Sequence, residues 1–237
     1  MSEQNSPINK RKLSEQIYEV LKERIVTLEI QPGERINPES LEAEFGVSRA
    51  PIREALQILS HEGLINPESR VGYFAVDLGR EDVDDIHETR KLFELFALDS
   101  AIRRMSTSDL KDLRKRSIQL QDQDIESPQS TKLLEEIDEE LHYNLIIGNS
   151  DNQFLKKFSK QIHDLVRLTR HLQERVPAAN EEHLNILQAL MEKDTIRAKE
   201  LLSIHLDEVK TQILDRFPLT PESENTQTKL KNDGIST

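Results

Sequence analysis

The sequence has no cysteine among its 237 residues. Disulfide bonds, thiolate nucleophiles and cysteine-based zinc or iron–sulfur centres are therefore excluded, and the composition fits a reducing compartment. Tryptophan is absent and glycine and tyrosine are scarce, at seven and three residues, which favours helices over a sheet-rich fold. No run of about 18 apolar residues occurs, and the first residues are polar, so neither a membrane span nor a secretory signal is expected. These absences predict a soluble, mainly helical protein of the cytoplasm.

Charged side chains are abundant and mostly acidic. The chain has 32 Lys and Arg against 44 Asp and Glu, a formal charge of −12. The first 78 residues carry nine basic and thirteen acidic side chains, so this part is acidic as well. A protein of this kind cannot coat nucleic acid by its bulk charge, because phosphate neutralisation requires clustered Lys and Arg. Any contact with DNA must come from particular arginines placed on one surface.

Three helices are predicted in the first 60 residues. The first runs from Ser14, a candidate N-cap, to about Leu28, since apolar residues recur there at helical spacing. Its predicted core positions are Ile17, Val20, Leu21, Ile25 and Leu28. A second, short helix opens at Pro38 and ends at Gly46. Residues 1–12 are polar, and we expect them to be flexible.

The third helix follows Ser48, which can cap it, and presents two different flanks. The packing side consists of Ile52, Ala55, Leu56 and Leu59. Arg49 and Arg53 lie one turn apart on another flank, with Gln57 beside them. Taken alone, such arginines are usually solvated or paired with a neighbour such as Glu54. Two helices joined by a tight turn, the second with arginines at its N-terminal end, are nevertheless typical of a helix-turn-helix that reads the major groove.

Two short β-prone segments after this helix, residues 64–66 and 73–76, predict a β-hairpin wing. The segment Val47 to Leu56, with Glu62-Gly63-Leu64 and the wing glycine Gly72, resembles the winged helix-turn-helix of GntR-type transcriptional regulators over about residues 14–77. The resemblance implies that the recognition-helix arginines, Arg49 and Arg53, contact operator bases and phosphates. The other predicted DNA-contacting residues are Ser48, Gln57 and Gly72, with Arg35 and Arg70 as secondary candidates for phosphate contacts.

The chain departs from this family at two points. Glu39 stands where some members place an arginine that contacts DNA. Val71 precedes the wing glycine, although basic residues are common there. DNA contacts at these two positions are therefore not carried over.

After Asp77, helical periodicity predominates up to Phe217, which predicts an antiparallel bundle of six helices. The predicted ranges are 80–105, 108–125, 131–147, 152–175, 180–192 and 195–216. Asp138 and His142 are four residues apart and should share one face of a helix. A turn near residue 193 would bring His183 and His205 to the same height on two adjacent helices.

Three imidazoles and a carboxylate, with no thiolate available, suit a divalent metal ion such as zinc, nickel, cobalt or manganese. A histidine or aspartate is more often an ordinary surface or core residue, and we assign His87, His163 and His171 to that group.

The same residues carry a second resemblance. Glu88-Thr89-Arg90 with Glu94, the pair Asp138 and His142, Ser150 to Asn152, and the region from Glu182 to His205 resemble the FCD ligand-binding domain of the FadR branch of GntR regulators, over residues 80–216. Six helices fit its VanR-like group. The resemblance implies that Asp138, His142, His183 and His205 bind a divalent ion, zinc first and nickel or manganese as alternatives, beside which a carboxylate effector binds. Arg90 could pair with that effector or simply with Glu94.

The leading hypothesis is thus an N-terminal winged helix-turn-helix (1–77), an all-α effector-binding and dimerisation bundle (78–217) and a disordered tail (218–237). We expect a homodimer that binds a palindromic operator, with a small organic acid modulating repression. One alternative is a metal-dependent enzyme, although a second Glu-x-x-His motif and the His-Glu-x-x-His signature are both missing. The other is a helical adaptor whose polar cluster holds no metal.

Overall fold

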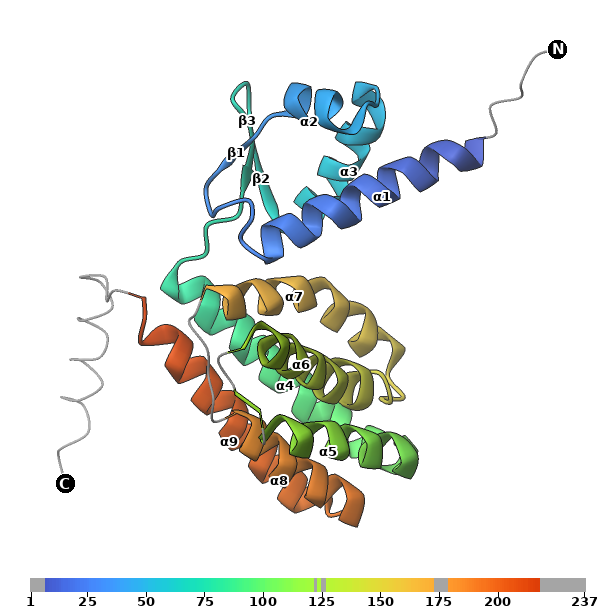
Figure 1. Ribbon diagram of the computed structural model, residues 1–237, viewed down its shortest axis with the longest axis vertical. Helices are drawn as coiled ribbons and strands as arrows, with labels where there is room; N and C mark the ends of the chain where they lie inside the picture. Colours follow the sequence, from blue (N-terminus) through green and yellow to red (C-terminus); the bar gives the residue numbers. More distant parts are fainter. Residues whose placement is uncertain (1–6, 122, 125–126, 173–178, 218–237) are drawn as a thin grey trace, which may run out of the picture.

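The computed structural model describes residues 7–121, 123–124, 127–172 and 179–217. The tail predicted to be disordered lies outside these residues. Two units follow each other along the chain, a small unit of helices and strands and then a helical bundle, as Figure 1 shows. The predicted fold class is confirmed. In the described part of the chain, no helix is long and apolar enough to cross a membrane.

The N-terminal unit packs helices against a small antiparallel sheet. Its elements are α1 (Pro7–Val26), β1 (Arg35–Ile36), α2 (Pro38–Phe45), α3 (Arg49–His61), β2 (Ile65–Glu68) and β3 (Gly72–Ala75). The strand order is β1-β3-β2, with Ile65 opposite Ala75 and Glu68 opposite Gly72. The buried core includes Ile17, Leu21, Ile25, Ile52, Ala55, Leu56, Leu59 and Leu64. The packing side predicted for the third helix is therefore confirmed.

The first helix differs from its prediction. It begins at Pro7 rather than Ser14, and proline is well suited to the first helical position. The prediction started later because the polar residues after Pro7 show no apolar periodicity. Ser14 consequently lies inside α1 and is buried, so it is not the cap. Val20 is 41% exposed rather than in the core. Leu28 lies beyond the helix end with a φ of 61°.

The turn between α2 and α3 matches the prediction. Gly46 ends α2 with a φ of 65°, the left-handed conformation that glycine adopts at least cost. Ser48 occupies the cap position of α3 with an extended backbone, but its side chain makes no capping hydrogen bond. Strand β1 was not predicted, since two residues cannot show a period. It pairs with the hairpin by placing Arg35 opposite Phe74.

The second unit is the predicted bundle. Its elements are α4 (Arg80–Arg104), α5 (Thr107–Gln121), α6 (Pro128–Asp138), the π-helix η1 (Glu139–Ile147), α7 (Gln153–His171), α8 (Ala179–Glu192) and α9 (Thr195–Leu214). Since α6 continues directly into η1, the described residues of this unit form six continuous helical segments, as predicted. The main core is aliphatic and lies between α4, α5, η1, α8 and α9.

The π-helix replaces the second half of a predicted α-helix. At its end the N–H of Gly148 donates to the carbonyl of Tyr143, five residues back, at 2.8 Å. A Cβ on Gly148 would lie 2.2 Å from the carbonyl oxygen of Asn144, so this position requires glycine. Short π segments frequently accompany functional sites because they re-aim side chains. Here the segment begins one residue after Asp138 and carries His142.

Helix α7 joins the two units. Arg167 donates to both carboxylate oxygens of Glu23 on α1, at 3.0 and 3.1 Å. Lys22 lies 3.9 Å from Asp164, and Leu165 packs against the core of the N-terminal unit. Figure 1 shows α7 running along the side of the bundle that faces α1. The same helix also contributes residues to the interior of the bundle, described next.

Candidate metal centre and DNA-reading face

The four predicted metal ligands meet in the centre of the bundle. Asp138 comes from the end of α6, His142 from η1, His183 from α8 and His205 from α9. One potential ligand atom from each lies within 4.8 Å of all the others. The predicted turn near residue 193 is present between α8 and α9, and it brings the last two histidines together as expected, with ring centroids 4.7 Å apart in an edge-on arrangement.

The three imidazoles point their Nε2 atoms at one another. The Nε2 of His183 lies 3.3 Å from that of His142 and 3.3 Å from that of His205. One carboxylate oxygen of Asp138 lies 3.7 Å from the Nε2 atoms of both His142 and His183. The described residues thus gather three nitrogens and one oxygen around a common point.

Two glutamates hold the outer sides of these rings. The Nδ1–H of His142 donates to Glu94 at 2.5 Å, and the Nδ1–H of His205 donates to Glu182 at 2.6 Å. In a neutral ring whose Nδ1–H donates, Nε2 carries a bare lone pair, so the neutral tautomers favoured by Glu94 and Glu182 turn these lone pairs toward His183. One proton on His183 could satisfy only one of them. A cation at the centre would satisfy all of them, so the donor set fits a divalent metal ion.

Burial keeps the ligands in the form that binds metal. It lowers the pKa of His205 to about 3, with help from His142, and it lowers the pKa of His183 well below its usual value. Both rings are therefore neutral at pH 7. Burial alone would raise the pKa of Asp138, but Arg170 and His142 more than offset this and hold it well below its usual range. The site thus offers two neutral imidazoles, those of His183 and His205, and an ionised carboxylate.

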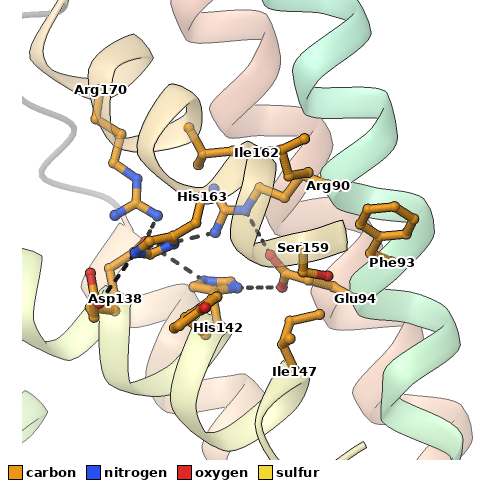
Figure 2. Close-up of a pocket in the computed structure, with 13 residues that line it drawn as sticks. Arg90, Phe93, Glu94, Asp138, His142, Ile147, Ser159, Ile162, His163 and Arg170 are labelled. Atoms are coloured by element: carbon orange, nitrogen blue, oxygen red, sulfur yellow. Dashed lines mark hydrogen bonds and ion pairs between the residues drawn. The ribbon is translucent and has the colours of Figure 1, made fainter. Parts of the chain in front are cut away.

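A small cavity of about 30 Å³ opens beside these ligands, between α4, η1 and α7. Figure 2 shows Arg90, Glu94, Asp138, His142 and Arg170 around its polar side. The apolar part of its lining consists of Phe93, Ile147, Ile162 and Val166. This volume holds about two water molecules, so any larger guest must displace a side chain.

Arg90 makes the predicted pair with Glu94 and retains free donors. Its Nε donates to Glu94 at 2.6 Å, which settles that the intrahelical pair exists. Its Nη1 and Nη2 atoms are buried and have no hydrogen-bond partner among the described residues, although Nη2 lies 3.9 Å from Asp138. Glu94 is ionised in this pair: burial would raise its pKa, but His142 and Arg90 bring it down to about 2. An anion in the cavity could therefore accept from the free side of Arg90.

Sequence reasoning missed Arg170, which lies in this site with the charged residues Arg90, Glu94 and Asp138. Arg170 on α7 ion-pairs with the outer oxygen of Asp138, as Figure 2 shows. The orienting role of Glu182 was also missed. The three histidines assigned to ordinary roles, His87, His163 and His171, lie outside the ligand cluster. His87 forms a hydrogen bond with Thr169 at 2.9 Å, and His163 pairs with Glu139 at 3.2 Å.

The predicted DNA-reading residues lie on α3 and at the wing. Arg49, Arg53 and Gln57 are exposed along α3. Arg53 has no ion-pair or hydrogen-bond partner among the described residues. Arg49, in contrast, pairs with Glu39 at 2.6 Å.

At the wing, Arg35 and Gly72 are in contact. The guanidinium of Arg35 donates to the carbonyl of Val71 at 2.8 Å. Gly72 has a φ of 145°, and a Cβ there would lie 3.3 Å from Nε of Arg35. The wing tip thus depends on glycine at this position, and Arg35 supports the tip while remaining exposed.

A winged helix-turn-helix joined to a helical bundle is typical of DNA-binding regulators. Residues 13–75 match the family model for bacterial regulatory proteins of the gntR family, and residues 85–208 match the FCD domain. The chain belongs to the GntR family and carries an FCD domain. It is a transcriptional regulator and not an enzyme.

Known relatives agree with this assignment. The chain is 31% identical to the Nta operon transcriptional regulator of Aminobacter aminovorans, over 80% of this chain and 89% of that protein. It is 30% identical to the gluconate operon transcriptional repressor of Bacillus subtilis, over 82% of each. Among solved structures, McbR/YncC of E. coli shares the fold with a TM-score of 0.72 at 20% identity, covering 86% of this chain and 98% of that one.

Proposed function

We propose that this regulator is a metal-containing homodimeric repressor that a small carboxylate releases from a palindromic operator. The observation that carries the metal is the convergence of three Nε2 atoms and one carboxylate oxygen on a single point. Zinc suits this donor set best, and nickel or manganese is the alternative. One relative is named for the gluconate operon, and gluconate is itself a small carboxylate, which supports the proposed effector class.

The proposed carboxylate would bind beside the metal. Arg90 offers two buried nitrogen atoms there that have no hydrogen-bond partner among the described residues, and a charged partner in a buried site gives strong bidentate recognition. The cavity is too small for such a guest without movement, since it holds about two water molecules. Arg170 blocks the outer oxygen of Asp138 and lines the same cavity. Its side chain is thus the group that an effector would displace.

The proposed homodimer would use a surface on α4 and α7. These two helices pack against each other and each exposes two large apolar side chains: Leu92 (66%) and Phe96 (58%) on α4, and Phe154 (73%) and Phe158 (48%) on α7. Exposed apolar groups of this size commonly mark interfaces. Phe96→Asp should shift the protein to monomer in light scattering, whereas Ile118→Asp on α5 should leave the dimer intact. A dimeric Phe96→Asp protein would exclude this surface.

In the dimer, each subunit would place α3 in one half-site, about one helical turn from the other. In vitro selection from random duplexes should then return inverted repeats. Selected sites without a two-fold pattern would contradict the dimeric mode of binding.

Elemental analysis tests the metal. Protein prepared without added metal or affinity tag should contain about one divalent ion per chain, and a His183→Ala variant treated identically should lack it. If the wild type contains no ion and takes up none from zinc solution, the cluster is a polar core and the metal part of the proposal is wrong. If the ion is present, small carboxylates including gluconate can be screened for metal-dependent release from the selected operator.

A further inference from the structure

The contact between Glu39 and Arg49 ties the two helices of the DNA-reading face together. Glu39 lies in the first turn of α2 and Arg49 is the first residue of α3. The Nη2 of Arg49 donates to Glu39 at 2.6 Å, and its Nε lies 3.8 Å from Glu42. Both partners remain more than half exposed, at 57% for Arg49 and 61% for Glu39. The pair is therefore accessible to an approaching duplex and can be opened by it.

The position of this pair matters for DNA binding. In a helix-turn-helix, the first residues of the recognition helix approach base edges while the preceding helix crosses the phosphate backbone. The N-terminus of that preceding helix would normally favour an anion, because its free N–H groups carry partial positive charge. Here Asn37 accepts from the N–H of Glu39, and the carboxylate of Glu39 adds negative charge at the same place. Both features reduce the attraction of α2 for phosphate.

We infer that Glu39 is a positioning residue that holds Arg49 in an ion pair and so weakens the binding of this regulator to random DNA. Arg53 has no such partner among the described residues and stays available in every complex. Arg49 becomes available only where the DNA offers a contact that replaces Glu39. This inference rests on the proposed placement of α3 in the major groove.

The test uses the full-length protein and a random-sequence duplex, so it requires no knowledge of the operator. Fluorescence anisotropy gives the Kd at a series of salt concentrations for the wild type, Glu39→Gln, Arg49→Ala and the double variant. Glu39→Gln should bind the duplex roughly two- to fivefold more tightly at low salt, the scale of one exposed ion pair. The slope of log K against log salt should steepen by about 0.9, which corresponds to one more phosphate contact. In the Arg49→Ala background, the same substitution should change neither quantity.

Glu54→Gln is the matched control. Glu54 is also exposed on α3 but makes no ion pair with Arg49, so this variant removes one negative charge near DNA without releasing the arginine. Equal effects of Glu39→Gln and Glu54→Gln would overturn the inference. So would a gain that persists in the Arg49→Ala background, because Glu39 would then act by repelling phosphate directly. If Arg53→Ala leaves duplex binding unchanged, the placement of α3 is wrong, which is a separate failure.

Discussion

Glu182 provides the sharpest test of how the proposed metal centre is held. Its carboxylate accepts the Nδ1–H of His205 at 2.6 Å, which fixes the ring orientation and leaves Nε2 free for the ion. Removing such an outer partner typically lowers metal affinity by 10- to 100-fold, or about 1.4 to 2.8 kcal/mol. Glu182→Ala should therefore weaken zinc binding by this factor. The protein should still bind one ion per chain, because all four ligands remain. Competition with a chromophoric chelator measures the affinity directly.

The neighbouring residue supplies the control for this prediction. Glu181 precedes Glu182 on α8 but is exposed, so Glu181→Ala removes the same charge without touching the ring. Its zinc affinity should match that of the wild type. The metal-free forms of both variants should melt close to metal-free wild type, since Glu182 is only partly buried and contributes little to folding. Unchanged zinc affinity in Glu182→Ala would refute the orienting role and weaken the tautomer argument on which the donor set depends.

Three other substitutions or treatments have defined outcomes. Removing the metal with a chelator should lower Tm by about 5 to 10 °C, since an ion at a hundred times its Kd stabilises by about 2.7 kcal/mol; an unchanged melting curve would contradict a resident ion. Gly148→Ala should destabilise by about 1–3 kcal/mol and reduce metal content, because its Cβ meets the Asn144 carbonyl; differential scanning calorimetry and elemental analysis measure both. Arg53→Ala should weaken operator binding by about 1–3 kcal/mol at unchanged Tm, as anisotropy would show.

Spacing alone predicted the two pairs within the candidate metal centre, and the family resemblance predicted that the pairs meet. His183 and His205 lie at similar distances from one short turn, so any antiparallel hairpin brings them together. Asp138 and His142 share a face in an α-helix, and the π segment at this point keeps them close enough to meet. No pattern of side chains in the sequence predicts that segment, which ends at Gly148, where a Cβ would meet the Asn144 carbonyl.

Arg170 could not be predicted for a different reason. Helix α7 contains several basic residues, and in the sequence each resembles a solvated surface charge. Only the rotation of α7 against α4 and η1 decides that Arg170 points to Asp138 while Arg167 points to Glu23 on the N-terminal unit. Such choices depend on packing between helices that are distant in the sequence. The early start of α1 was missed for another reason: its first residues are polar and show no hydrophobic periodicity from which a helix could be inferred.

In the structure, several of the acidic residues orient or engage nitrogen-bearing side chains. From the net charge of −12 alone, we could infer only that this protein does not coat DNA by its bulk charge. In the bundle, Glu94 and Glu182 hold the rings of His142 and His205 in the tautomer that exposes Nε2. On the reading face, Glu39 engages the first arginine of the recognition helix. In each case a carboxylate controls the nitrogen beside it, so removing that carboxylate should change what the nitrogen can bind while the fold remains intact.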